Sequence, residues 1–248
     1  MANQRNLSNP ADELVDLALG LSYRAYTSSG GREDSRDYII EMRADILGEI
    51  EQELGKPHME VHLGILKFSL IRVGGAINDG FPQHELFDIS QEICDLAGGL
   101  YGAGFEEFKG PIARSFPDAS PWEDILFFQS LELHPFARRQ RVGLSALHRA
   151  AKDWESGCGL VVIQPYPLQY PNGERDDDTW RRLGMDESTP DFKTSKQKLE
   201  NYYQQLGFEK AGPSNYMFRC PTESQIEVDV PHSILLPQGT IDAHTRLT

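Results

Sequence analysis

The stretch that decides the fold covers residues 125–163 and reads ILFFQSLELHPFARRQRVGLSALHRAAKDWESGCGLVVI. Its apolar run at 125–133 is long enough for a buried central strand. Residues 143–155 then place apolar side chains at spacings of three and four, which is typical of an amphipathic helix. A second apolar run at 160–163 predicts another short strand. This order of strand, helix and strand predicts a βαβ unit with a parallel strand pair.

The turn between the first strand and the helix carries the clearest chemical signal. Gly143 lets the backbone approach a ligand closely, and the N–H groups at a helix start favour an anion. Arg138, Arg139 and Arg141 add positive charge just before it. The chain has no P-loop Lys-Ser/Thr pair and no GxGxxG after a strand, so the turn suits a diphosphate better than a nucleotide with Mg²⁺. The arginines are also compatible with a solvated surface loop.

Composition narrows the classes of partner. The chain has 248 residues, is 39% apolar and carries a formal net charge of −14. This charge disfavours nucleic acid and anionic membranes, and it attracts cations. No apolar run is long enough for a membrane helix, and the start does not resemble a secretory signal. Because Cys94, Cys158 and Cys220 fit neither a disulfide framework nor a zinc site, we expect a cytoplasmic protein without a metal.

The remaining sequence predicts a single α/β domain over residues 1–248, with a helical N-terminal part over 1–56. The elements expected in the first half are helices at 11–26 and 36–54, a long strand or hairpin at 60–73, and a helix at 83–101. The elements expected near the end are a short helix at 179–183, a helix at 195–206, and a hairpin formed by 208–211 and 216–220.

Two motifs resemble those of the GNAT superfamily of acetyltransferases. The run from Leu131 to Ser145 resembles the family's motif A, in which a strand leads to R/Q-x-x-G-x-G/A at a helix start. The run from Tyr203 to Phe208, YQQLGF, resembles the family's Tyr-x-x-Leu-Gly-Phe signature. The clear resemblance covers residues 122–220, with insertions at about 80–105 and 165–194. It implies a mixed, curved sheet that splays at the central strand and carries helices on both faces.

The resemblance also implies acetyl-CoA as the acyl donor and no metal. The pantetheine arm would pair with the backbone of the central strand, the pyrophosphate would rest on the turn, and Tyr203 would protonate the leaving thiolate. The implied cofactor-binding residues are Leu131, Leu133, Arg138, Arg139, Gln140, Arg141, Val142, Gly143, Leu144, Ser145 and Tyr203. Transfer to the amine would be direct, without an acyl-enzyme.

Three features depart from the family pattern. The spacing from Pro135 to Gly143 is about two residues longer than usual, which leaves the register of the arginines open. Ser145 stands where the family has Gly or Ala. Lys196 stands near a position that is Asn in many relatives.

Two catalytic assignments have structural alternatives. Tyr203 is either the general acid or an aromatic residue that packs the last helix. Glu132 is either a general base for the amine or a carboxylate at a solvated strand end. Simple alternation places Glu132 on one face with Phe128 and Ser130, opposite Leu131 and Leu133.

The sequence thus predicts an N-acetyltransferase that acts on a primary amine, with a small cationic molecule as the expected acceptor. A non-catalytic acyl-CoA-binding sensor module is the first alternative. Acetylation of a protein N-terminus or lysine is the second, and it differs only in how open the acceptor groove is. The resemblance leaves open whether the protein forms a homodimer.

Overall fold

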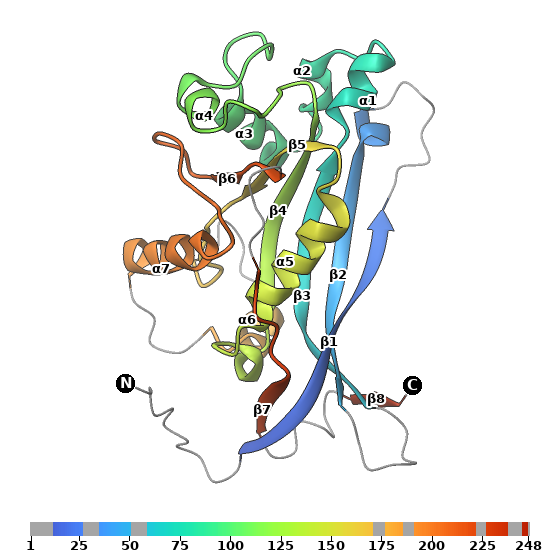
Figure 1. The fold of residues 1–248 in the computed structure, drawn as a ribbon, viewed down its shortest axis with the longest axis vertical. Helices are drawn as coiled ribbons and strands as arrows, with labels where there is room; N and C mark the ends of the chain where they lie inside the picture. Colours follow the sequence, from blue (N-terminus) through green and yellow to red (C-terminus); the bar gives the residue numbers. More distant parts are fainter. Residues whose placement is uncertain are drawn as a thin grey trace.

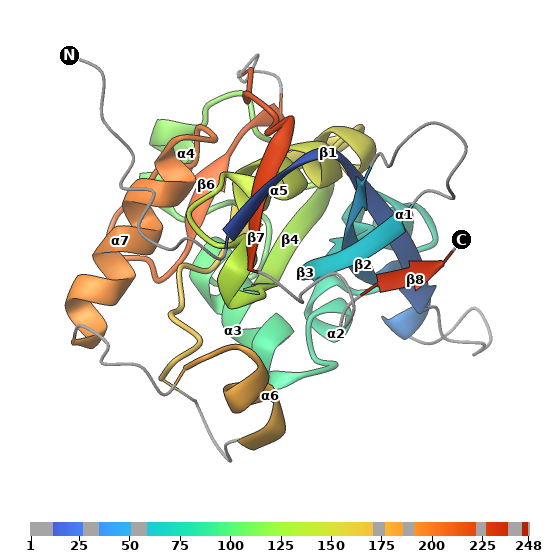
Figure 2. The same ribbon diagram turned by 90° about the horizontal axis from the view of Figure 1, so that it is seen from below.

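The computed structural model describes residues 12–26, 35–50, 59–170, 177–185, 191–221, 227–237 and 245–247. The described strands form one curled, mixed sheet in the order β6-β5-β4-β3-β2-β1-β7, with β8 paired to β3 (Figures 1 and 2). Among the described strands, only β4 and β5 pair in parallel. The strands are β1 (Asp12–Tyr26), β2 (Ile39–Ile50), β3 (Met59–Ile71), β4 (Asp124–Leu133), β5 (Cys158–Ile163), β6 (Met217–Arg219), β7 (Ser233–Pro237) and β8 (Thr245–Leu247).

Helices cover both faces of this sheet, and each face has its own buried cluster. The α-helices are α1 (Val73–Asn78), α2 (Gln83–Leu86), α3 (Gln91–Leu100), α4 (Gly110–Ser115), α5 (Val142–Trp154), α6 (Asp177–Arg182) and α7 (Phe192–Gln204). Helices α5 and α7 contribute to one cluster, around Phe68 and Phe128. Helices α1, α2, α3 and α4 contribute to the other, around Phe127 and Phe218. The sequence prediction of a mixed sheet with helices on both faces is confirmed.

The βαβ unit that the sequence predicts is present. Strand β4, helix α5 and strand β5 follow one another, and β5 pairs with β4 in parallel. The predicted hairpin is also found, because Glu209 and Phe218 exchange two backbone hydrogen bonds of 2.8 Å. The predicted helix at 83–101 is broken into α2 and α3, and the region at 60–73 forms one long strand, β3.

The two helices predicted in the N-terminal part are wrong, because β1 and β2 occupy these segments. In β2 the buried residues Met42, Ala44 and Ile46 alternate with more exposed ones, which is the period of a strand. Strands of 15 and 12 residues are much longer than the usual length of about five or six. Over such a length the apolar residues also match a helical spacing, and only pairing with distant strands decides between the two.

Strand β4 contains a β-bulge at Gln129. Lys67 of β3 lies opposite Ser130, and the next residue, Phe68, lies opposite Phe128, so Gln129 is the extra residue. Strand β5 pairs with β4 only from Asp124 to Phe128. Among the described strands, none continues along that edge of β4, so the sheet opens beside residues 129–133.

The packing of the core on the α5 side can be tested at Phe68. Its side chain is fully buried and its ring lies against those of Tyr23, Phe128 and Trp154. Because a cavity would remain, Phe68→Ala is expected to lower the free energy of unfolding by about 3–5 kcal/mol in urea titration. Tyr26→Ala is the control, since Tyr26 is 54% exposed. Equal unfolding midpoints for the two variants would contradict this packing.

Candidate functional site

A cavity of about 420 Å³ lies where β5 leaves β4. Its walls come from β4, from residues 164–169 after β5, and from one face of α7. Leu131, Leu133 and Leu199 make part of it apolar, while three cationic side chains and one carboxylate also line it. The charged residues are Arg138, Arg139, Lys198 and Glu132. In a chain with a net charge of −14, this excess of cations favours an anionic ligand with an apolar part.

The structure brings about half of the predicted site residues to this cavity. Those that line it are Leu131, Glu132, Leu133, Arg138, Arg139 and Tyr203. The residues of the turn itself, from Gln140 to Ser145, are not among its lining residues. Val142 and Leu144 are buried in the α5 cluster, and the buried hydroxyl of Ser145 has no hydrogen-bond partner among the described residues.

Tyr202 separates the cavity from the turn. Its hydroxyl lies directly over Gly143 and has the backbone N–H of Leu144 as a hydrogen-bond partner. Burial raises the pKa of Tyr202 to about 12, against the opposing effects of this N–H and of Arg141. The phenol therefore stays protonated at neutral pH. Because it accepts from Leu144 and also lines the cavity, Tyr202 connects the start of α5 to the cavity wall.

The turn contains local backbone strain. Arg139 and Arg141 have φ of 60° and 63°, the left-handed region that non-glycine residues seldom adopt. Each such residue costs about 1–3 kcal/mol, and these residues cluster at ligand clamps and active sites. The side chain of Arg141, the N-cap residue of α5, makes no hydrogen bond that caps the helix. The first N–H groups of this helix thus depend on partners from outside it.

Gln140 holds the turn against strand β7. Its Nε2 donates to the carbonyl oxygens of Phe136 and Leu235, at 2.6 and 3.0 Å, and its Oε1 accepts from the Leu235 N–H at 2.7 Å. The amide group thereby pairs with β7 as a neighbouring strand would. Arg138 has a similar anchoring role, because its guanidinium donates to the carbonyl oxygens of Leu133 and Leu183.

Tyr203 packs and also faces the cavity. It is 6% exposed, belongs to the α5 cluster and contacts the rings of Tyr202 and Phe208. Burial raises the pKa of its hydroxyl, which therefore remains protonated in neutral solution. Both sequence interpretations of Tyr203, as a packing residue and as a proton donor, are compatible with this placement.

The predicted face of Glu132 is wrong. The bulge at Gln129 breaks the alternation, so Leu131 and Leu133 share the α5 side with Phe128. Glu132 points to the opposite side, where its Oε1 accepts from the Lys67 Nζ at 3.2 Å. The carboxylate is 11% exposed, so it is a partly buried, paired group and not a solvated strand end.

Sequence reasoning missed the α7 contribution apart from Tyr203. Ser195, Lys198, Leu199 and Tyr202 all line the cavity. Their spacing of three, one and three residues is the signal for one helical face, and this pattern was present in the sequence. The residues 171–176 and 186–190 of the predicted 165–194 insertion lie outside the described residues.

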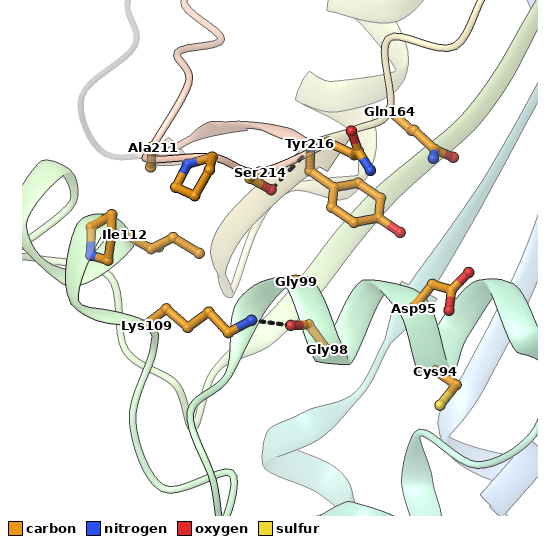
Figure 3. A pocket seen from close by; sticks show the side chains of 13 residues that line it. Cys94, Asp95, Gly98, Gly99, Lys109, Ile112, Gln164, Ala211, Ser214 and Tyr216 are labelled. Atoms are coloured by element: carbon orange, nitrogen blue, oxygen red, sulfur yellow. Dashed lines mark hydrogen bonds between the residues drawn. The ribbon is translucent and has the colours of Figure 1, made fainter.

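A second cavity of about 700 Å³ lies between α3, α4 and residues 211–216 (Figure 3). It shares Gln164 with the first cavity. Its polar groups bind one another or nearby residues: Lys109 donates to the Gly98 carbonyl oxygen, and Asp95 accepts from Gln91 at 2.7 Å. Charge is thus less concentrated here than in the first cavity.

The comparisons with known proteins add no identification. No family model, no curated protein and no solved structure matches the chain. Within the described residues, no group of three His, Cys, Asp or Glu side chains could hold a metal ion. None of the helices described is long and apolar enough to cross a membrane.

A substitution at Gly143 tests how closely the turn is packed. A Cβ at this position would lie 2.6 Å from the Tyr202 hydroxyl and 2.8 Å from Leu131 Cδ2. Gly143→Ala is therefore expected to lower the free energy of unfolding by about 1–3 kcal/mol in urea titration. The control is Gly98→Ala in α3, where a Cβ meets nothing within 4 Å. That change is expected to stabilise by about 0.5–1 kcal/mol, and equal stability of the two variants would contradict the contact.

Proposed function

We propose that this protein transfers an acetyl group from acetyl-CoA to a primary amine. The observation that carries the proposal is the cavity beside the part of β4 that β5 leaves after Phe128, with apolar walls and an excess of cations. Residues 129–132 of β4 lie along the edge that β5 leaves, and backbone groups on this edge would offer hydrogen bonds to the amide groups of a pantetheine arm. Arg139 and the Tyr202 hydroxyl offer donors to its pyrophosphate. The two sequence motifs support the same donor.

The proposed chemistry is a direct transfer. The amine nitrogen attacks the thioester carbonyl carbon, and the tetrahedral oxyanion collapses with loss of the CoA thiolate. Tyr203, protonated and at the cavity wall, gives its proton to this thiolate. Glu132 accepts the proton that the amine must lose, and its pairing with Lys67 holds the carboxylate in place.

A matched pair of tyrosine variants separates catalysis from binding. Tyr203→Phe is expected to lower kcat by about 10²-fold or more, the usual share of a general acid, with little change in the Kd of CoA. Tyr202→Phe is expected to weaken CoA binding by about tenfold, because a hydrogen bond to a charged group is lost. Release of free CoA thiol across a panel of amines gives kcat, and calorimetry gives Kd.

The outcomes distinguish the alternatives. Full turnover by Tyr203→Phe would remove this residue from the acid role. Tight CoA binding without turnover on any amine or peptide would favour an acyl-CoA sensor. Absence of CoA binding by the unmodified chain would overturn the proposed function.

A further inference from the structure

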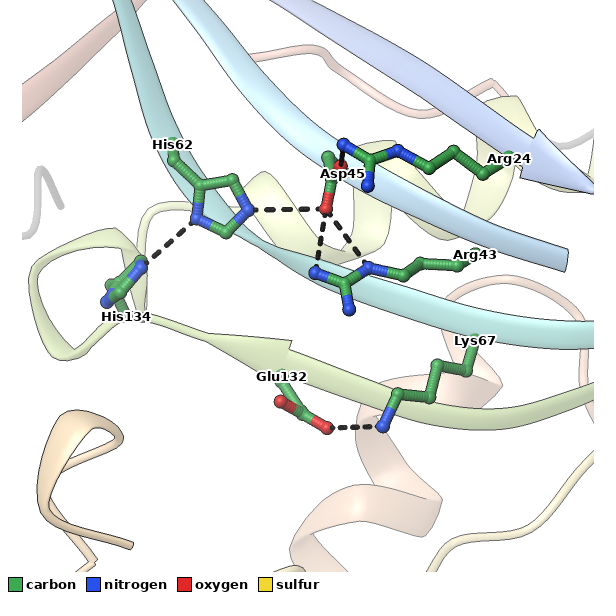
Figure 4. A network of polar contacts seen from close by, with 7 residues as sticks. All are labelled: Arg24, Arg43, Asp45, His62, Lys67, Glu132 and His134. Carbon is green, nitrogen blue, oxygen red and sulfur yellow. Dashed lines mark hydrogen bonds and ion pairs between the residues drawn. The ribbon is translucent and has the colours of Figure 1, made fainter. Parts of the chain in front are cut away.

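Three cationic side chains form a row across neighbouring strands on the face of the sheet opposite α5. Arg24 of β1 lies directly opposite Arg43 of β2, and Arg43 lies directly opposite Lys67 of β3. Directly opposed residues have Cβ atoms about 4.5–5.5 Å apart, and like charges in such pairs are destabilising. Figure 4 shows all three beside the carboxylates that balance them. We call Arg24, Arg43 and Lys67 the cationic row.

The carboxylates that balance the cationic row are those of Asp45 and Glu132. Asp45 binds Arg24 at 3.3 Å and Arg43 at 3.2 Å, and it also lies 3.6 Å from His62. The side chains of Asp45 and Glu132 are 12% and 11% exposed, whereas those of Arg24, Arg43 and Lys67 are 61%, 37% and 49% exposed. The acids are thus covered while the cations face outward.

After these ion pairs, the cationic row still has hydrogen-bond donors that no described residue uses. One carboxylate, Asp45, serves two guanidinium groups, and Arg43 uses its Nε and Nη2 on it. The Nη1 donors of Arg43 make no hydrogen bond to the described residues. An arginine with donors left over binds carboxylates with strong, charge-assisted hydrogen bonds.

The row ends at the first cavity. Lys67 lies opposite Ser130 and donates to Glu132, and both of these line the cavity. Neighbouring strands are about 4.8 Å apart, so Lys67 is one strand and Arg43 two strands from the cavity wall. Burial and the nearby carboxylate of Glu41 raise the pKa of Glu92, against the opposing effects of the Gln129 hydrogen bond and the Lys67 ammonium. Lys67 thus has two carboxylates nearby, those of Glu132 and Glu92, where the cationic row meets the cavity.

We propose that the cationic row is a binding site for the carboxylate of the acceptor, so that the acceptor is an amino acid and not a simple amine. This proposal rests on the proposed acetyltransferase function. The amino group lies at Glu132 beside the thioester, and the carboxylate lies on Lys67 and Arg43. An amino acid carries both charged groups, so it matches the carboxylate of Glu132 and the cations of the row at once.

Matched pairs of acceptors test the proposal. Each amino acid is compared with its decarboxylated counterpart: arginine with agmatine, ornithine with putrescine, and tyrosine with tyramine. For at least one pair, kcat/KM is expected to favour the amino acid by about tenfold or more, the factor for a charge-assisted hydrogen bond. Arg43→Gln is expected to reduce this preference to about twofold or less, and Arg43→Lys to an intermediate value.

Lys152→Gln is the matched control. It removes the same charge from α5, on the other side of the sheet, and Lys152 is exposed. The preference is expected to survive in this variant. Turnover of the amines without any preference for the amino acids, or a preference that persists in Arg43→Gln, would overturn the inference and leave the acetyltransferase intact.

A further measurement separates failure of this inference from failure of the proposed acetyltransferase function. If acetyl-CoA neither binds nor reacts, calorimetry with the same acceptor pairs still tests the row. Binding of the amino acid that Arg43→Gln weakens supports a carboxylate site. Absence of binding, or equal binding by both proteins, overturns it.

Discussion

Among the described strands, β4 has a partner on its β5 edge only as far as Phe128, and the candidate site depends on this interruption. The extra residue Gln129 marks the same point. Its side chain donates to Glu92 at 2.9 Å and lies 3.4 Å from the Ser69 hydroxyl, so α3 and β3 both hold the bulge. Beyond it the strand continues to pair with β3 while its other edge lines a cavity. One irregular residue thus separates the part of β4 that is paired on both edges from the part that lines the cavity.

The bulge also decides which side chains reach each face. It places Leu131 and Leu133 against the start of α5, and it turns Glu132 toward Lys67. Without the bulge, Glu132 would point into the apolar cluster below α5, where an ionised carboxylate is costly. The cavity therefore has an apolar side toward α5 and a charged side toward the cationic row. In the proposed reaction these sides hold the donor and the acceptor.

The sequence predicted the βαβ unit well because its signals are local. An uninterrupted apolar run, a turn and an amphipathic helix each fit within about a dozen residues. It failed for β1 and β2 because their identity depends on pairing with distant strands. It also missed the face of Glu132, since an alternating pattern does not reveal a bulge, and the bond between Gln140 and Leu235, which are 95 residues apart. The cationic row needed the register of three strands, which no spacing along the chain provides.

The central claim is that CoA lies between the open edge of β4 and the start of α5, and amide hydrogen exchange tests it most directly. Exchange is measured by mass spectrometry with and without saturating CoA. The account predicts slower exchange in two peptides, one covering residues 129–133 and the other covering 139–145, with no change in α3. Unchanged exchange in both peptides while CoA is bound would place the ligand elsewhere and contradict the account.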